Sequence, residues 1–192
     1  RFLWTEWRDT GSRLLQLAAR VQVSDEQKAV AAATRAWGLW NVGTATTGGE
    51  TREPADLIAA WGANGEEAAQ KAFALAPQNP YVAVTQVELL RKQLGAEIEK
   101  RRAANAPPAE LEKLVRGYPA TAIAVLEPAL DKAPANVSLI EAFTELMRQE
   151  HFQLAADGKN EAALEAIARA SKRAEAAVAQ SPDSPELHFL LG

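Results

Sequence analysis

Apolar residues recur every three to four positions along most of this chain, which is the spacing of amphipathic helices. Such runs span residues 24–42, 66–76, 81–103, 120–132, 138–156 and 161–180, and a less regular run spans residues 3–22. The sequence lacks the alternation of apolar and polar residues, rich in β-branched side chains, that would indicate strands. The pattern therefore predicts an all-α fold.

Capping and turn signals set the expected ends of these helices. Ser24 followed three residues later by Gln27 is a capping box, which predicts a helix start there. The dipeptide Thr10-Gly11 could break the run over 3–22. Residues 43–53 have little apolar content and include two adjacent glycines, so we expect a loop.

Glycine and proline predict interruptions inside two longer stretches. Residues 62–65, Gly-Ala-Asn-Gly, predict a turn between a short helix over 54–61 and the next helix. Residues 117–119, Gly-Tyr-Pro, predict a break between a helix over 108–116 and the helix that follows. In that following helix Pro128 removes one backbone hydrogen bond, and we expect a bend.

Proline also marks an internal repeat. Three alanine-rich helices end in Pro77, Pro134 and Pro182, and each is followed within a few residues by a new helical run. The third restart has Ser184 as N-cap and Pro185 at the first helical position. Short turns inside each helix pair, such as residues 157–160, predict antiparallel hairpins joined by proline-containing turns, which is typical of an α-solenoid.

These residues resemble the tetratricopeptide repeat (TPR) family. The resemblance is carried by Ala72 with Pro77, Ala129 with Pro134, Ala177 with Pro182, the Leu191-Gly192 pair and the RKQLG segment at 91–95. It is good over 66–192 and weak before that, where LWNVG at 39–43 marks a degenerate first helix. The resemblance implies a TPR-like α-solenoid of antiparallel helix hairpins in a right-handed superhelical array. We expect residues 1–50 to form an N-terminal Trp-rich helical region, either a degenerate repeat or a cap, and residues 51–192 to form the repeats.

The repeats are longer than those of the family. The prolines at 77, 134 and 182 lie 57 and 48 residues apart, against about 34 in a TPR. In the second interval, the residues beyond the family's repeat length would add about two turns to each of the two helices. We therefore expect oversized hairpins. The chain begins with Arg1 and ends early in a helix, so we expect it to be a piece of a longer protein, truncated in the first helix of a further repeat; the alternative is a short terminal helix.

Composition narrows the function classes. The formal net charge is −4, and the one basic cluster, residues 100–102, follows Glu97 and Glu99, so a solvated helix face is expected in place of a nucleic-acid site. No apolar stretch approaches the roughly 20 residues of a membrane-spanning helix. Without cysteine there is neither disulfide nor thiolate nucleophile, and the cellular compartment stays open.

The candidate chemistry is sparse. His151 and His188 fall in different helices, and Glu150-His151 lacks the second histidine of a helical zinc motif. Residues 46–49, Thr-Thr-Gly-Gly, lack the lysine of a phosphate-binding loop, and the acidic pairs at 66–67 and 97–99 look solvent-facing. We therefore expect no enzyme activity, cofactor or metal; a deep pocket holding Glu150, His151 and a further carboxylate would favour an enzyme. The tryptophans at 4, 7, 37, 40 and 61 predict an aromatic core, with an exposed platform as the alternative.

Two hypotheses for function remain. The first is a protein-interaction scaffold that binds a peptide or partner helix on its concave face. By resemblance, that face comprises Tyr81, Val84, Glu88, Arg91 and Lys92, then Ser138, Glu141, Glu145, Arg148 and Gln149. Its mixed signs favour a partner with both charges, and Val84 and Glu88 replace the lysine and asparagine with which the family clamps chaperone C-termini. The second hypothesis is an architectural or regulatory module that docks on other domains of a larger protein or assembly machine.

Overall fold

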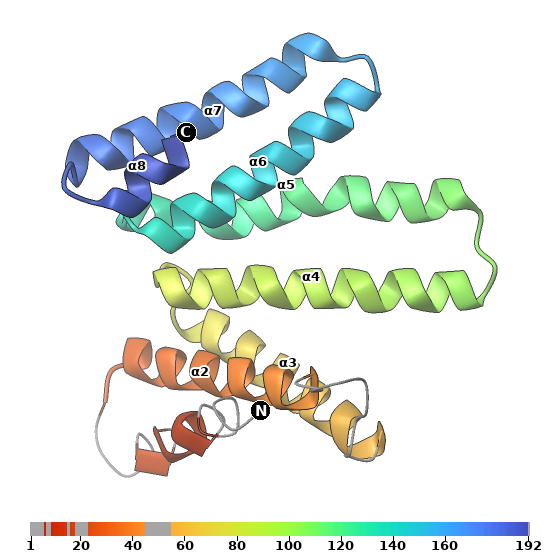
Figure 1. Cartoon of the computed structure of the whole chain (residues 1–192). Helices are drawn as coiled ribbons and strands as arrows, with labels where there is room; N and C mark the ends of the chain where they lie inside the picture. Colours follow the sequence, from red (N-terminus) through yellow and green to blue (C-terminus); the bar gives the residue numbers. More distant parts are fainter. Residues whose placement is uncertain (1–5, 7–8, 15, 18–22, 45–54, 192) are drawn as a thin grey trace. The chain divides into compact units, whose positions relative to one another are not determined.

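The structure is a computed structural model that describes residues 6, 9–14, 16–17, 23–44 and 55–191. Every regular element in these residues is an α-helix, which confirms the all-α prediction. The helices are α2 (Asp25–Thr44), α3 (Ala55–Leu75), α4 (Pro80–Ala103), α5 (Pro108–Lys132), α6 (Val137–Ala156), α7 (Asn160–Gln180) and α8 (Pro185–Leu191), in the order shown in Figure 1.

The chain forms two compact units, Arg1–Gln86 and Val87–Gly192, and α4 contributes to both. In the first unit α2 packs on α3. The core where α2, α3 and the start of α4 meet is built mostly from small side chains: Ala29, Ala32, Ala33, Ala72 and Val82. Alanine lets helices approach closely while still removing apolar surface from water. The predicted boundary near residue 50 lies inside this unit.

In the second unit α6 is the central helix, and it contacts α5, α7 and α8. It contributes large buried residues: Leu139, Ile140, Phe143, Leu146 and Met147. The buried stripe of α7 consists of alanines: Ala163, Ala166, Ala170, Ala174 and Ala177. Large residues on one helix therefore fill the space left by small residues on the other. The turn between them uses Gly158 with φ 73°, a left-handed conformation that glycine adopts without strain.

The helix ends before α4, α6 and α8 share one geometry. Ala72, Ala129 and Ala177 are fully buried, and each carbonyl accepts a hydrogen bond from the N–H four residues later, at 3.1, 2.9 and 3.0 Å. The N–H groups of Asn79, Asn136 and Ser184 then bond back to the carbonyls of Ala76, Ala133 and Ser181, each at 3.1 Å. The proline lies inside this turn, where its missing N–H leaves no bond unmade.

The helix starts that follow also match. The side chains of Asn79, Asn136 and Ser184 accept hydrogen bonds from the N–H groups of Val82, Leu139 and Leu187, at 3.2, 3.1 and 3.4 Å. Each of those three apolar residues is fully buried. We call this shared unit of helix end, turn and capped helix start the junction. Its three copies give the proline repeat a common local structure.

The predicted capping box is confirmed at the start of α2. The Ser24 N–H donates to Gln27 Oε1 at 2.9 Å, and the Gln27 N–H donates to Ser24 Oγ at 3.2 Å. The break proposed at Thr10-Gly11 is wrong, because residues 9–14 are helical. A Cβ at Gly11 would lie 2.7 Å from Arg35 Cα, so this glycine permits a close approach of two backbones.

The predicted turn over residues 62–65 is also wrong, because α3 runs through it without interruption. Gly65 in this stretch is explained by a side chain of the neighbouring helix α2. A Cβ at Gly65 would lie 2.6 Å from Cδ1 of Trp40, whose indole is buried. Gly65 is therefore a packing residue, and a glycine inside a helix costs only about 1 kcal/mol relative to alanine.

The break predicted over residues 117–119 is wrong for a similar reason. The helix α5 continues through Gly117 and the buried Pro119 to Lys132. Proline cannot donate to the carbonyl four residues earlier, which here is that of Val115. Gln153 of α6 supplies the missing donor, with its Nε2 3.3 Å from that carbonyl oxygen. A tertiary contact thus compensates for the local defect.

Part of the predicted aromatic core is visible. Trp37 and Trp40 pack edge to face with ring centroids 5.9 Å apart, and Trp37 Nε1 donates to the buried Thr85 Oγ1 at 2.9 Å. Trp4, Trp7 and most of the loop predicted over 43–53 lie outside the described residues, while residues 43–44 belong to α2.

Candidate functional site

The predicted concave-face residues occupy equivalent positions on two helices. Those on α4 and those on α6 are related by a constant offset of 57 residues, the same offset that separates Pro77 from Pro134. Tyr81 and Val84 belong to the first unit, while Glu88, Arg91, Lys92 and the α6 residues belong to the second.

Most charged members of this predicted face are already paired. Arg91 donates to both oxygens of Glu88 at 2.7 and 2.8 Å, and Lys92 lies 3.5 Å from the same carboxylate. The equivalent Arg148 donates to Glu145 at 2.9 and 2.8 Å. The hydrogen bonds that Arg91 donates to Glu88 are the main cause of a raised pKa of Arg91. The pair on α6 is therefore neutral, whereas the α4 cluster of Glu88, Arg91 and Lys92 keeps one net positive charge.

Glu145 itself experiences opposing influences. Partial burial raises its pKa, but hydrogen bonds from Gln149 and Arg148 outweigh that effect, so the net shift of the pKa is downward. Tyr81 shows the reverse balance, because burial raises its pKa more than a hydrogen bond with Thr34 lowers it. Both groups keep their ordinary charge at neutral pH.

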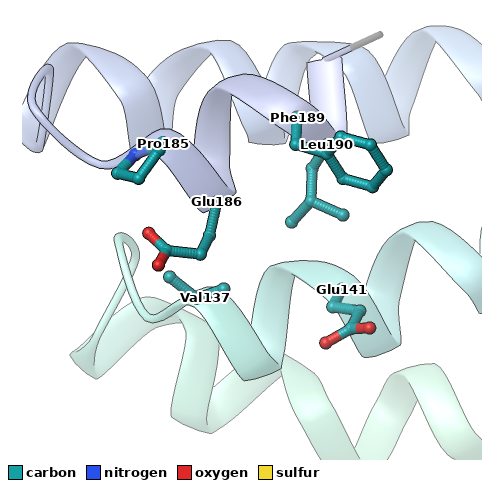
Figure 2. Close-up of a pocket in the computed structure, with 6 residues that line it drawn as sticks. All are labelled: Val137, Glu141, Pro185, Glu186, Phe189 and Leu190. Carbon is teal, nitrogen blue, oxygen red and sulfur yellow. The ribbon is translucent and has the colours of Figure 1, made fainter.

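A groove lies between the start of α6 and α8, with a cavity of about 420 Å³. Its lining, shown in Figure 2, consists of Val137 and Glu141 of α6 with Pro185, Glu186, Phe189 and Leu190 of α8. We call this the α6/α8 groove. Four of these six side chains are apolar and two are carboxylates. Glu141 is the one member of the predicted concave face that lines it.

The register of α8 explains why apolar groups face the groove. Leu187 is fully buried, in the helix that packs on α6 and α7. Leu190, one turn later, is half-buried and points from α8 toward α6 (Figure 2). Phe189, two residues after Leu187, falls on a different side of the helix and is 84% exposed. Burying Leu187 thus leaves a phenylalanine ring in water.

The two carboxylates differ in their surroundings. Glu186 accepts a hydrogen bond from Ser184 Oγ at 2.9 Å, and the hydrogen bond to its own backbone N–H followed by that from Ser184 lowers its pKa. Glu141 is exposed and has neither an ion pair nor a hydrogen-bond partner among the residues that the structure describes. The rim of the α6/α8 groove therefore carries negative charge, and one of its carboxylates is free to bind.

Sequence reasoning placed Ser138 and Glu141 near this surface and missed Val137, Pro185, Glu186 and Phe189. Leu190, which also lines the groove, is half-buried. The helical period of 3.6 residues was a usable signal for Phe189, because a residue two positions from a buried leucine cannot share its side.

The two histidines make structural contacts. His151 Nδ1 lies 3.0 Å from the carbonyl oxygen of Ala163, and His188 Nε2 lies 2.8 Å from that of Pro182. A carbonyl oxygen can only accept, so each of these ring nitrogens carries the proton and donates. Within the described part of the chain, no three His, Cys, Asp or Glu residues come together as a metal site. None of the helices among the described residues has the length and apolar character of a membrane-spanning segment.

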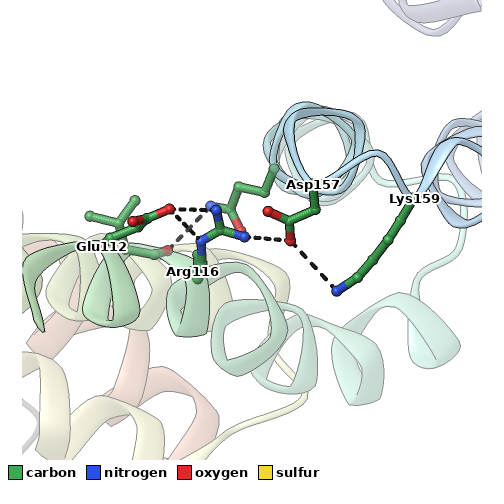
Figure 3. A network of polar contacts seen from close by, with 6 residues as sticks. Glu112, Arg116, Asp157 and Lys159 are labelled. Carbon is green, nitrogen blue, oxygen red and sulfur yellow. Dashed lines mark hydrogen bonds and ion pairs between the residues drawn. The ribbon is translucent and has the colours of Figure 1, made fainter. Parts of the chain in front are cut away.

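A polar network ties α5 to the turn between α6 and α7 (Figure 3). Arg116 pairs with Glu112 one turn earlier and with Asp157 in the turn, each at 2.5 Å, and Lys159 lies 3.5 Å from Asp157. Hydrogen bonding from Arg116 is the main cause of a lowered pKa of Asp157. We assign this network to holding the hairpin ends together.

Comparison with protein-family models, with curated proteins and with solved structures found no match.

Proposed function

We propose that this chain is a non-enzymatic protein-interaction scaffold built as a TPR-like, right-handed α-solenoid, which binds a peptide or partner helix on its concave face. The α6/α8 groove is the observation that carries the proposal. It combines a half-buried leucine, an exposed phenylalanine and an unpaired carboxylate, and such a mixture suits recognition better than mere solvation.

The repeated junction supports the architectural part of the proposal. Because α4, α6 and α8 each follow a junction of the same geometry, they are the equivalent first helices of successive hairpins. In stacked hairpin repeats the first helices line one face, so a groove between two of them is the expected place for an extended or helical ligand.

Affinity capture with matched variants tests the proposal. The test variant is Phe189→Asp in the groove, and the control variant is Leu164→Asp on α7. Both side chains are largely exposed (84% and 67%), so neither change should unfold the protein. Partners held by the wild-type chain and by the Leu164 variant, but lost with Phe189→Asp, would support the groove. Partners retained by both variants would contradict it.

A second candidate is an architectural module whose long hairpin docks on another domain. The observation in its favour is the apolar exposure near the turn between α6 and α7, where Phe152 is 58% and Leu164 is 67% exposed. The same experiment separates the two functions. Loss of capture with Leu164→Asp and its retention with Phe189→Asp would favour docking through the hairpin tip.

A further inference from the structure

We infer that the α6/α8 groove selects a basic partner: a peptide segment that places a bulky apolar side chain in the groove and a lysine or arginine beside it. The inference rests on the proposed function, and it specifies the chemistry of the ligand.

The size and apolar walls of the α6/α8 groove suit a bulky apolar side chain. The cavity of about 420 Å³ falls within the roughly 300–1,000 Å³ of sites that enclose small ligands, so it accommodates a few side chains of a peptide. Val137, Pro185 and Leu190 provide apolar walls, and the Phe189 ring stands beside them. A leucine, methionine or aromatic side chain entering here would cover the ring and displace water from all four groups.

The carboxylates at the rim of the groove favour a basic group on the ligand. Both polar lining residues are carboxylates, and Asp183 in the adjoining junction is exposed as well. A ligand that covers Glu141 must compensate the lost hydration of an ionised group, and an ammonium or guanidinium does so by direct pairing. A partner with Asp or Glu at the same place would instead meet like charge.

On the predicted concave face, Glu141 is the one carboxylate unpaired among the described residues. The residue equivalent to Glu141 on α4 is Val84, and the other acidic residues of that face, Glu88 and Glu145, pair with arginine. The mixed signs expected for the whole concave face therefore consist of two clusters in which the carboxylate is paired and one unpaired carboxylate, Glu141. A second copy of the chain would bring an acidic rim against an acidic rim, which argues against self-association through this surface.

Selection from a random peptide display library on residues 1–192 tests the inference. We expect the enriched peptides to carry a large apolar residue within a turn of a Lys or Arg. With a synthetic copy of the best peptide, Phe189→Asp should weaken binding at least about tenfold, as for a central contact residue. Glu141→Lys should weaken it about two- to fivefold, the range of an exposed ion pair, and wild-type binding should weaken with added salt.

The controls are Leu164→Asp for the apolar change and Glu165→Lys for the charge change; both positions are exposed on α7, and both variants should bind as the wild type does. Enrichment of neutral or acidic peptides that still depend on Phe189 would overturn the basic-partner inference and leave the scaffold function standing. Peptides insensitive to Phe189→Asp would show that binding occurs elsewhere and overturn the groove assignment. Failure to enrich any peptide would count against both.

Discussion

At the scale of single residues, glycine has two different roles within one turn of α3. Gly65 faces the buried indole of Trp40, whereas a Cβ at Gly62 would meet nothing within 4 Å. We predict that Gly62→Ala stabilises the protein by about 0.5–1 kcal/mol, because alanine loses less backbone entropy on folding. Gly65→Ala should destabilise it by about 1–3 kcal/mol through overpacking.

Urea unfolding of both variants measures this contrast. The two substitutions are chemically identical and three residues apart, so each serves as the control for the other. Equal effects of the same sign would show that helix propensity alone governs the site and that Trp40 can move away from position 65.

A second residue-scale prediction concerns acid stability. Hydrogen bonding from Arg116 lowers the pKa of Asp157 in the folded chain, so the folded state favours the ionised carboxylate. The stabilisation is therefore present above the ordinary pKa of aspartate, near 3.9, and is lost as the pH falls through the lowered value. We expect wild type to exceed Asp157→Asn in stability at pH 7, and the two to converge at the acid end.

Thermal melts of both proteins over a pH series measure this difference, and NMR titration of the Asp157 carboxyl locates its pKa directly. The Glu99–Arg102 pair on the exposed face of α4 provides a control, since Glu99→Gln should have little effect at any pH. A stability difference that persists unchanged at low pH would mean that Asp157 does not act through its charge.

At the scale of helices, the continuity of α5 depends on a contact with α6. Pro119 leaves the Val115 carbonyl without its helical donor, and Gln153 provides one from the neighbouring helix. We predict that Gln153→Ala costs about 0.5–1.5 kcal/mol in the wild type, the usual net value of a hydrogen bond. In a Pro119→Ala background residue 119 regains its N–H, so the same change should cost much less.

A double-mutant cycle in urea measures this coupling. Gln149→Ala is the matched control, because Gln149 donates to Glu145 within α6 and should cost the same in either background. An additive cycle for Pro119 and Gln153 would contradict the proposed rescue.

These helices show where sequence reasoning succeeds and where it stops. Local signals were sufficient for the Ser24 capping box, the start of α8 at Pro185 and the turn at Gly158, because their partners lie within a few residues. Two predicted interruptions failed for a nonlocal reason. Trp40 accounts for Gly65 from another helix, and Gln153 compensates for Pro119 from another hairpin, and neither relation has a signature in the local sequence.

At the scale of the whole molecule, the chain carries a reporter for one of its two units. All five tryptophans precede residue 87, and the second unit has none. Tryptophan fluorescence therefore follows the unfolding of the first unit, while far-ultraviolet circular dichroism follows helices in both. We predict transitions with different midpoints, because arrays of hairpins lose all-or-none cooperativity more readily than single cores do.

Gly65→Ala should then shift the fluorescence midpoint more than the dichroism midpoint. Coincident transitions in the wild type and the variant would show that α4, which runs through both units, couples them into one cooperative fold.

The α6/α8 groove also depends on contacts between helices that are far apart in the sequence. The sequence allowed the equivalence of the α4 and α6 faces to be recognised, since both carry Glu-x-x-Arg at matching positions. The groove required three-dimensional information, because it depends on how α8 lies across the start of α6 and on which charges are already paired. Of the ten expected face residues, Glu141 alone lines the α6/α8 groove.

The junction has the same geometry in each copy, although the hairpins that it connects differ in length. The capped helix starts at Ser24, Asn79, Asn136 and Ser184 are 55, 57 and 48 residues apart, yet the last three follow turns with the same hydrogen bonds. Between the last two spacings the difference lies mainly in the helical arms, since α4 and α5 have 24 and 25 residues whereas α6 and α7 have 20 and 21. Such a chain can gain or lose helical turns at a hairpin tip while the junction stays unchanged, so insertions become a means of lengthening a hairpin.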